Sequence, residues 1–501
     1  MRPFWLTLAL IGIGGIGVTL SLAPFNLWPL AFISAAILHR LISVHSLKNA
    51  LTHSFLFSFT VHLSGVHWVW VSMHDYGGMS PIFAGFATVM FCLFLAIWII
   101  PFTWIYQRYL QRQMIGTTFG FAGLWFLHEW VRTWLFTGFP WLFIGYSQTE
   151  GPFRELAPIL GVMGIGFCIA LISSYLSLIT RGHMNRQHAM FFSLSLAFLV
   201  GLLLVSKHTP WTHPTNTTPI NAVIFQPNTP LYEKWNPMNH DRIVQTTIDQ
   251  SKQHMSDRTL LVWPETHIPS LLNSVHEPLT VLNDDAKQRN TTVLIGIQTQ
   301  RNQQYFNSLI TLGANQGIYH KQKLVPFGEY IPFDQWLRGI IAFFDLPASR
   351  FSSNASPQPP LSVFNTNIAP FICYEITYPS FVYEQAKRSG LLLTISNDAW
   401  FGRSIGPIQH MQMAQMRALE TGRYVLRANN TGISGIVDNN GTLLETIELL
   451  EQGVINAPVP IYSGNTPIVR YGLKPQLILV FTLIFLLLLR YYRSRKSNST
   501  K

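Results

Sequence analysis

Three short segments of the sequence each carry a reactive side chain at the end of a β-rich run. The side chains are the carboxyl group of Glu265, the ammonium group of Lys321 and the thiol of Cys373. Side chains at strand ends can converge across a sheet, and these three groups are the parts needed for covalent acyl transfer. In that chemistry the carboxylate takes the thiol proton, the thiolate attacks a carbonyl carbon, and the ammonium group and backbone N–H groups stabilise the oxyanion.

Cys373 differs in its surroundings from the other two cysteines of the chain. Cys92 and Cys168 lie in long apolar runs, where a cysteine is ordinarily a small buried hydrophobic residue. Three cysteines placed in this way cannot form a disulfide framework. A single thiol in a water-facing domain is a liability in an oxidising compartment unless it is shielded or has a use.

The elements that must position these side chains lie in residues 207–473, whose composition is that of a globular domain. Short β-rich runs alternate there with helical patterns, which favours a layered α/β domain over a sandwich of strands alone. The predicted strands are Asn221–Gln226, Thr259–Trp263, Thr292–Gln298, Asn307–Leu312, Gly317–Lys321, Ile368–Cys373, Leu391–Ser396 and Gly432–Asp438, and the predicted helices are 239–255, 278–289, 379–388 and 407–423. Turns at 314–317 and 439–441 contain Asn and Gly, which is typical of hairpin connections.

The remainder of the chain is dominated by apolar runs. With 48% hydrophobic and 11% charged residues, the 501-residue chain is too apolar for a fully soluble protein and too long for one ordinary domain. Runs of about 17 to 25 apolar residues are long enough to cross a bilayer. They predict eight spans, at 4–22, 27–43, 52–71, 82–105, 118–136, 156–180, 189–206 and 475–492.

Basic residues predict the orientation of these spans, because Lys and Arg accumulate on the cytoplasmic side. With the N-terminus inside, the short outer loops carry only Arg154. The residues then placed inside are Arg2, Arg40, Lys48, Arg108, Arg112, Arg181, Arg186, Arg490, Arg493, Arg495, Lys496 and Lys501. Both termini are therefore expected in the cytoplasm. A cleaved signal peptide is the alternative for the first run, but no Ala-x-Ala site follows it.

The predicted organisation is a seven-span domain at 1–206, a catalytic domain at 207–473, and a C-terminal span with a basic tail at 474–501. The same orientation places the catalytic domain on the far side of the membrane, in the periplasm of a bacterium with two membranes. The net charge of +11 does not indicate nucleic acid, because residues 207–474 hold 20 Lys+Arg and 19 Asp+Glu. We therefore expect no nucleic-acid partner.

Glu129 and Arg132 lie three residues apart in the fifth predicted span, on one face of a helix. Ionisable groups at that depth are costly unless they are paired. A structural ion pair is the preferred interpretation, and contact with a phospholipid headgroup is the functional alternative.

The motifs around the reactive residues resemble those of the nitrilase, or carbon–nitrogen hydrolase, superfamily over about residues 220–460. They are Leu324-Val325-Pro326-Phe327-Gly328-Glu329-Tyr330, Cys373-Tyr374-Glu375 and Asn397-Asp398-Ala399-Trp400-Phe401-Gly402. In the apolar part, Gly138-Phe139-Pro140-Trp141 and Gly145-Tyr146-Ser147-Gln148 match as well, so that the whole chain resembles the apolipoprotein N-acyltransferase family. This resemblance implies a membrane α-helical bundle, here with eight predicted spans, joined to an α/β nitrilase-like αββα sandwich.

The resemblance also implies the roles of the three reactive residues. Glu265 would be the general base, Lys321 the oxyanion stabiliser and Cys373 the nucleophile. Lys323 competes for the role of the lysine, because its two-residue offset leaves it on the same strand face. The family pattern, with the lysine three residues before the Leu of Leu-Val-Pro, selects Lys321.

Four further residues are expected to support the site or to bind substrate. Glu329 and Glu375 resemble family residues that would hydrogen-bond Lys321 or orient a flap, with ordinary partly buried carboxylates as the alternative. Tyr374 follows the nucleophile, so its backbone N–H is a natural oxyanion donor. Trp235 matches a tryptophan that the family uses near its substrate entrance, and packing at the surface is the alternative.

The family implies a ping-pong reaction, the last step of lipoprotein maturation. A phospholipid would give an acyl chain to Cys373 as a thioester, and the N-terminal amine of an S-diacylglyceryl-cysteine lipoprotein would accept it. We expect no cofactor, and the histidines are too scattered to indicate a metal site. A monomer in the bacterial inner membrane is the expected state.

The apolar segment 330–350 is a candidate lid that would exclude water from the thioester, with a helix packed on the domain core as the alternative. Two rival functions share parts of the pattern. A membrane-anchored amidase or nitrilase would use the same three residues, but it needs no multi-span domain. A non-enzymatic lipoprotein chaperone or transporter would have no use for an intact set of Glu265, Lys321 and Cys373.

Overall fold

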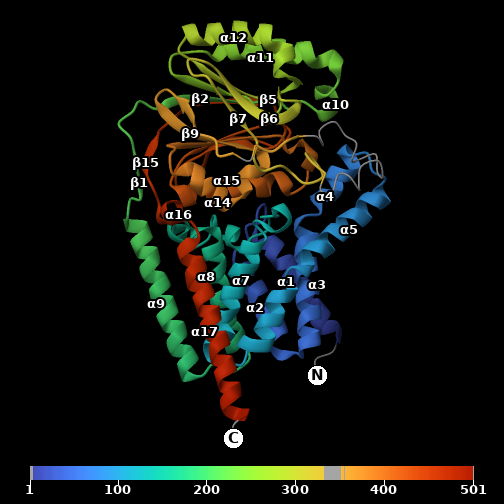
Figure 1. Cartoon of the computed structure of the whole chain (residues 1–501), viewed down its shortest axis with the longest axis vertical. Coiled ribbons are helices and arrows are strands. Elements are labelled where there is room, and N and C mark those ends of the chain that lie inside the picture. Colours follow the sequence, from blue (N-terminus) through green and yellow to red (C-terminus); the bar gives the residue numbers. More distant parts are fainter. Residues whose placement is uncertain (1–3, 332–350, 355, 500–501) are drawn as a thin grey trace. The chain divides into compact units, whose positions relative to one another are not determined.

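The computed structural model describes residues 4–331, 351–354 and 356–499, so the predicted lid lies outside the described residues from 332 onward. The chain forms two compact units, which are coloured along the sequence in Figure 1. The helical unit comprises Met1–Trp70, Ser80–Pro210 and Tyr471–Lys501, and the sandwich unit comprises Val71–Met79 and Trp211–Arg470. Each unit is described by itself.

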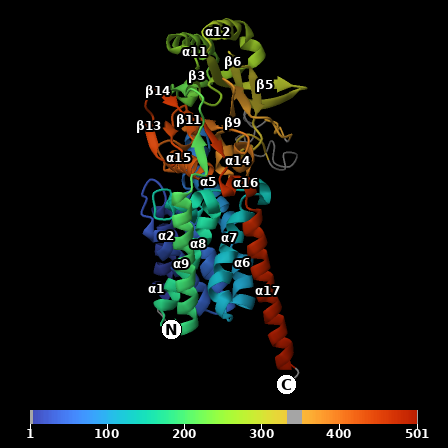
Figure 2. The ribbon, with the colours of Figure 1, turned by 90° about the vertical axis from the view of Figure 1, so that its left-hand side faces the viewer.

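The helical unit consists of apolar helices with small residues at their contacts. The helices are α1 (Phe4–Ser21), α2 (Pro29–Val44), α3 (Leu47–Gly65), α4 (Trp68–Val71), α5 (Pro81–Ile97), α6 (Ile100–Ile105), α7 (Phe121–Val131), α8 (Ala157–Ile179), α9 (Arg186–His208) and α17 (Lys474–Ser499). Helices α1, α2 and α8 pack together in this unit (Figure 2). A Cβ on Gly15 of α1 would lie 2.6 Å from Thr60 of α3, so glycine permits their close approach.

Five helices among the described residues are long and apolar enough to cross a membrane, whereas the sequence predicts eight spans. They are Phe4–Ser21, Pro81–Leu110, Arg154–Ile179, Arg186–His208 and Lys474–Ser497. Helix α2 is apolar but shorter. Helix α3 carries polar residues such as Ser58 and His62, and α7 ends at Val131 inside the predicted span 118–136. The count of eight is therefore not confirmed.

An irregular segment follows α7 and contains both motifs of the apolar part. The Oε1 atom of Glu129 accepts hydrogen bonds from Trp125 Nε1 and from the N–H of Ile144, each at 3.0 Å. The guanidinium group of Arg132 donates to the carbonyl oxygen of Trp141. Through these hydrogen bonds, the buried side chains of Glu129 and Arg132 anchor this segment to α7.

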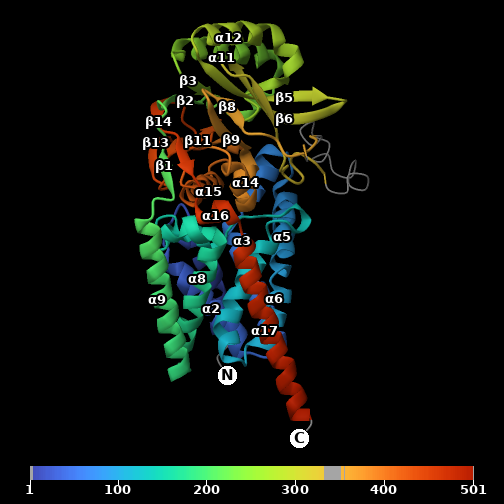
Figure 3. The same ribbon diagram turned by 60° about the vertical axis from the view of Figure 1, so that its left-hand side comes forward.

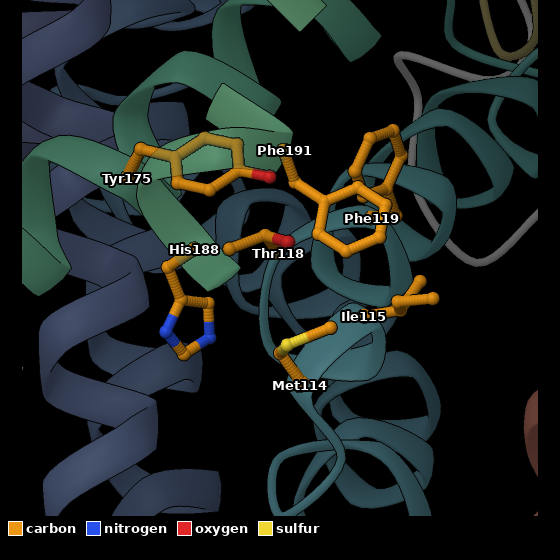
Figure 4. Close-up of a pocket in the computed structure, with 7 residues that line it drawn as sticks. All are labelled: Met114, Ile115, Thr118, Phe119, Tyr175, His188 and Phe191. Atoms are coloured by element: carbon orange, nitrogen blue, oxygen red, sulfur yellow. The ribbon is translucent and has the colours of Figure 1, made fainter. Parts of the chain in front are cut away.

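Two small pockets lie among the helices of this unit. The pocket in Figure 4 is too small to hold a water molecule. It is lined by Met114, Ile115, Thr118, Phe119, Tyr175, His188 and Phe191. The second pocket has about 30 Å³, which is enough for one water molecule. Neither lining contains a thiol or a carboxylate.

The sandwich unit contains two large sheets, with strand orders β14-β2-β3-β5-β6-β7 and β13-β12-β11-β10-β9-β8, and β4 pairs with β5. The strands are β2 (Ile220–Gln226), β3 (Thr259–Val262), β4 (Ile268–Leu271), β5 (Thr292–Arg301), β6 (Gln304–Gly313), β7 (Gly317–His320), β8 (Leu361–Val363), β9 (Thr366–Ile372), β10 (Leu391–Ser396), β11 (Val425–Asn429), β12 (Ser434–Val437), β13 (Leu443–Ile447) and β14 (Gly453–Val459). A separate pair joins β1 (Thr212–Pro214) to β15 (Tyr462–Gly464).

Helices cover the outer faces of the two sheets, which gives an αββα sandwich (Figure 1). The helices of this unit are α10 (Leu231–Lys234), α11 (His240–His254), α12 (His276–Gln288), α14 (Pro379–Ala386), α15 (Gly406–Thr421) and α16 (Pro467–Tyr471). Strand β2 shows why the layers form: Ile220, Ala222 and Ile224 pack in the cluster between the sheets, and Val223 and Phe225 pack in the cluster with α11 and α12. The predicted fold of this part is confirmed.

Every predicted strand and helix of the sandwich unit is present within three residues of its expected ends. The two predicted hairpin turns join β6 to β7 and β12 to β13. The long β5–β6 hairpin projects beyond the rest of its sheet (Figure 3). Strand β11 was not predicted, because Arg427 and Asn429 interrupt its apolar pattern although both are fully buried.

Residues 71–79 precede α5 in sequence but pack within the sandwich unit. The hydroxyl group of Ser72 donates to the carbonyl oxygen of Trp400 at 2.8 Å. The rings of Tyr76 and Trp400 meet edge to face with centroids 6.2 Å apart. Gly402 has φ +54°, and a Cβ there would lie 3.0 Å from Val71. The Asn397–Gly402 motif thus has a structural contact outside residues 207–473.

Candidate active site

Cys373 lies where β9 runs into the 3₁₀ turn Cys373–Thr377. Strand β9 is held between β8 and β10, so its end is fixed from both sides. The backbone φ of Cys373 is +53°, in the left-handed region that residues with a Cβ rarely adopt. Its thiol is half-buried, whereas Cys92 and Cys168 are buried. The turn therefore presents the thiol at the end of the strand.

Lys321 directly follows β7, and its side chain is 1% exposed. Its Nζ donates to Glu265 Oε1 at 3.1 Å and to Glu329 Oε1 at 2.9 Å. Lys323, the competing lysine, is exposed, and its Nζ lies 5.5 Å from the ring centroid of Tyr378. The structure thus brings Lys321, and not Lys323, between the two carboxylates.

Glu265 lies in the turn after β3, where Pro264 cannot continue the strand ladder. Its Oε1 also accepts from Asn307 Nδ2 at 2.7 Å, and its Oε2 accepts from the N–H of Asn397 at 2.9 Å. Strand β5 passes very close by, since a Cβ on Gly296 would lie 2.4 Å from the carbonyl oxygen of Pro264. Contacts from both sheets therefore fix this carboxylate.

The charges of the site act strongly on one another. Burial tends to lower the pKa of Lys321, but the carboxylates of Glu265 and Glu329 outweigh it and raise that pKa well above its usual value. Burial raises the pKa of the Cys373 thiol, and Glu265 raises it further against the opposing effect of Lys321. At neutral pH the site therefore holds an ammonium group next to a protonated thiol.

Glu329 and Glu375, both expected to support the site, have different contacts. Glu329 bonds Lys321 directly. Glu375 is fully buried and accepts hydrogen bonds from the N–H groups of Ile372 at 2.7 Å, Gln322 at 2.6 Å and Lys323 at 3.1 Å. It therefore ties the end of β9 to the segment after Lys321. Burial raises the pKa of Glu375 to about 7.

The two other predicted residues differ in exposure. Tyr374 is buried, and its backbone N–H belongs to the peptide group that joins it to Cys373. Trp235 follows the short helix α10 and is 40% exposed. The neighbouring Lys234 is buried and donates from Nζ to the carbonyl oxygen of Glu265 at 3.2 Å. The segment that carries Trp235 is thus linked to Glu265 through Lys234.

Comparison with known proteins identifies the family. The Apolipoprotein N-acyltransferase N-terminal domain model matches residues 14–175, and the Carbon-nitrogen hydrolase model matches residues 224–463. An apolipoprotein N-acyltransferase from Azotobacter vinelandii is 38% identical over 499 residues, which cover 98% of this chain and 96% of that protein. One from Pseudomonas putida is 38% identical and covers 96% of each chain. This chain belongs to the apolipoprotein N-acyltransferase family.

Membership of the apolipoprotein N-acyltransferase family makes the chain an acyltransferase, as predicted, with a carbon–nitrogen hydrolase domain and membrane-spanning helices. Among solved structures, a carbon–nitrogen hydrolase superfamily protein from Xanthomonas campestris is similar at 15% identity, covering 53% of this chain and 97% of that chain with a TM-score of 0.37. Within the residues that the structure describes, no group of three or more His, Cys, Asp or Glu could hold a metal ion.

Several residues around this acyltransferase site were missed by the sequence analysis. Asn307 Nδ2 donates to Glu329 Oε1 at 2.8 Å as well as to Glu265, so it joins the two carboxylates. Burial lowers the pKa of Lys234 to about 8. Asp398 lies inside a recognised motif, yet its partners come from α15 and β11, which no local pattern could connect to it. Only the fold brings these segments together.

Proposed function

We propose that the chain transfers an acyl chain from a phospholipid to the N-terminal amine of an S-diacylglyceryl cysteine on an apolipoprotein, through a thioester on Cys373. The observation that carries this proposal is the buried ammonium group of Lys321, held between the carboxylates of Glu265 and Glu329. The half-buried thiol of Cys373 interacts electrostatically with all three groups. A nucleophile, a base and a fixed cation are thus present in one site.

In the first step, Glu265 accepts the S–H proton while Cys373 attacks the ester carbonyl of the phospholipid. Because the resting thiol is protonated, proton transfer and attack belong to the same step. Lys321 has three N–H donors, and among the described residues two of them bond carboxylates, which leaves the third for the oxyanion. The backbone N–H of Tyr374 is the second proposed donor. Collapse of the tetrahedral intermediate breaks the ester C–O bond and expels the lysophospholipid oxygen, which takes up the proton held by Glu265.

In the second step, the free amine of the diacylated lipoprotein attacks the thioester carbonyl. Glu265 accepts the amine proton, the same donors stabilise the oxyanion, and the C–S bond breaks to give the amide. The departing thiolate of Cys373 then regains its proton from Glu265. Glu329 and Glu375 support Lys321 and the turn at Cys373, and Trp235 would contact a substrate at the entrance. No cofactor is needed, because every proton and acyl group is accounted for by these residues.

The proposed location is the bacterial inner membrane, with both termini in the cytoplasm and the sandwich unit in the periplasm. The distribution of Lys and Arg along the sequence supports this orientation. Both proposed substrates are lipids anchored in a bilayer, which suits a catalytic domain joined to apolar helices. We propose that the protein acts as a monomer, with domains at 1–206, 207–473 and 474–501.

The direct test is to look for the covalent intermediate. The purified full chain in detergent would be incubated with a phospholipid labelled in its acyl chains, and intact mass would reveal an adduct on Cys373. We expect an adduct that hydroxylamine removes and that a synthetic diacylated lipopeptide also removes, with transfer of the label to the lipopeptide amine. The Cys373→Ala variant should give no adduct.

An absent adduct in the wild type, or one that persists in Cys373→Ala, would overturn the proposal. An adduct formed from a short amide and released to water, without transfer to the lipopeptide, would support the rival amidase. If the protein bound the lipopeptide but formed no labelled adduct and no labelled lipopeptide, the result would support the non-enzymatic rival.

A further inference from the structure

A buried polar network lies beside Cys373, and the proposed reaction steps do not use it. Asp398 is its centre: Oδ1 lies 3.0 Å from His410 Nδ1, and Oδ2 accepts from Arg427 Nη2 at 2.6 Å and from Asn429 Nδ2 at 2.7 Å. These four side chains are at most 1% exposed. They come from the turn after β10, from α15 and from β11.

The network contacts Cys373 through His410. The Nε2 atom of His410 lies 3.2 Å from the backbone carbonyl oxygen of Cys373. A carbonyl oxygen can only accept a hydrogen bond, so Nε2 carries the proton and donates it. On the other side of the ring, Nδ1 lies 3.0 Å from Asp398 Oδ1 and 3.1 Å from Arg427 Nη2. A protonated Nδ1 donates to the carboxylate and an unprotonated Nδ1 accepts from the guanidinium, so in either state one of these contacts orients the imidazole.

The carbonyl group of Cys373 shares one planar peptide group with the N–H of Tyr374. The hydrogen bond from His410 therefore fixes the direction of that N–H as well as of the carbonyl. It also holds the peptide that follows a residue at φ +53°, a conformation that needs support from its surroundings. The N–H of Tyr374 is the proposed oxyanion donor, and its alignment decides how strongly it binds the oxyanion.

We propose that His410 is a positioning residue for acyl transfer, which aims the Tyr374 N–H at the oxyanion by holding the carbonyl of Cys373, with Asp398 and Arg427 orienting its ring. This inference rests on the proposed role of Cys373 as the nucleophile. The neighbouring N–H of Asn397 bonds Glu265 Oε2 at 2.9 Å, so the turn after β10 positions the base and the oxyanion donor together.

The experiment compares three variants of the full chain. His410→Gln keeps an N–H donor at the distance of Nε2 from the backbone, His410→Asn keeps a donor only at the distance of Nδ1, and His410→Leu has none. Two rates are measured for each: formation of the acyl adduct on Cys373 from labelled phospholipid, and alkylation of Cys373 by iodoacetamide. Alkylation displaces iodide at carbon and develops no oxyanion, so it does not need the Tyr374 N–H.

We expect acylation to fall on the order of 10-fold to 100-fold in His410→Leu and His410→Asn, because a misplaced donor loses alignment with the transition state. Alkylation of the same variants should change less than about threefold, a change well below that expected from lost alignment. His410→Gln should recover most of the acylation rate. The apparent KM for phospholipid should stay constant while kcat falls, since the contact acts on the transition state.

A variant that loses stability away from the site serves as the control. Leu282→Ala in α12 removes buried apolar contacts from the cluster under α11 and α12, and its acylation rate should follow its folded fraction only. If His410→Leu does not fold, the comparison of the two polar variants still decides the question, because only Gln reaches the carbonyl.

The outcomes separate this inference from the proposed function. No adduct in the wild type would overturn the proposed function. A wild-type adduct, with His410→Leu acylating at the wild-type rate, would overturn the positioning role alone. An equal fall of acylation and alkylation in all three variants would also overturn it, because that pattern describes general damage to the fold.

Discussion

At Cys373 two neighbouring charges act on one proton in opposite directions. Burial and the carboxylate of Glu265 disfavour the thiolate and outweigh Lys321, which favours it, so the pKa of the thiol is well above its usual value. An enzyme that stored a free thiolate would react with any electrophile that entered the site. In the proposed mechanism, the thiolate of Cys373 therefore forms only as a substrate carbonyl is attacked.

Replacing Glu265 with Gln should have opposite effects on two reactions of the same thiol. Removing the carboxylate lowers the pKa of Cys373, so alkylation by iodoacetamide at pH 8 should become several times faster. Acyl transfer should become about 10²-fold to 10⁴-fold slower, because the proposed general base is lost. The two rates can be measured by intact mass on one preparation.

Lys321→Met provides the control for that pair of rates. Loss of the cation should raise the pKa of Cys373 further, so that both alkylation and acyl transfer become slower. If Glu265→Gln slowed alkylation as Lys321→Met does, the assigned direction of the charge effect would be wrong.

Glu375 should make the stability of the protein depend on pH. Its pKa is about 7 in the folded state, against 4.5 for an ordinary glutamate, because burial disfavours the charged form. The folded state then holds its proton to higher pH than the unfolded state does. This contribution to stability is fully present below about pH 4.5 and is lost as the pH rises through about 7, by about 3 kcal/mol in all.

The measurement is the melting temperature of the detergent-solubilised protein between pH 5 and pH 8. The wild type should lose stability over this window, and Glu375→Gln, which has no titrating group, should show a flatter curve. Identical curves for the two proteins would contradict the assignment.

At the scale of elements, the close contact of β5 with the turn after β3 sets the position of Glu265. A Cβ on Gly296 would lie 2.4 Å from the carbonyl oxygen of Pro264 and 2.7 Å from the Cα of Glu265. Gly296→Ala must therefore displace this turn. Because a shift of about 1 Å can cost 10²-fold in rate, we expect acyl transfer to fall by about that factor.

Gly201→Ala in α9 is the matched control, since a Cβ there meets no atom within 4 Å. Its acylation rate should equal that of the wild type, and its melting temperature should not fall. An unchanged acylation rate in Gly296→Ala would show that the turn tolerates displacement and that Glu265 is positioned by its hydrogen bonds alone.

The elements also show which parts of the fold and of the candidate site could be predicted from the sequence. Short runs of apolar and β-branched residues sufficed for strands such as β2 and β10, and family motifs pointed to Glu265, Lys321 and Cys373. Strand β11 was missed because its buried Arg427 is paired with Asp398, an interaction that becomes visible only in three dimensions. The predicted count of eight spans is not confirmed, because apolar composition alone does not reveal that α7 ends at Val131.

At the scale of the whole molecule, the proposed orientation can be tested with single cysteines in a Cys373→Ala background. Asn440 lies in the exposed β12–β13 turn, and Ser494 is exposed near the C-terminal end of α17. In whole cells whose outer membrane is permeabilised and whose inner membrane is intact, a membrane-impermeant maleimide should label Asn440→Cys and not Ser494→Cys. Inside-out vesicles should give the reverse labelling.

The two remaining cysteines, Cys92 and Cys168, are buried and should stay unlabelled in both preparations. Labelling of Ser494→Cys from outside the cell would contradict the orientation. Equal labelling of both positions on one side would place the C-terminal tail and the sandwich unit in the same compartment.

The hydrogen bond from the Asn397 N–H to Glu265 Oε2 joins residues 132 positions apart in the sequence, which follow strands of the two opposite sheets of the sandwich. Such contacts form late, since a long loop must close before they gain any energy. A newly made chain with one sheet complete would thus carry a cysteine with no base beside it. Capacity to be acylated should appear only at the end of folding, which makes the acyl adduct a sensitive reporter of the native state and spares unfinished chains from capturing lipid.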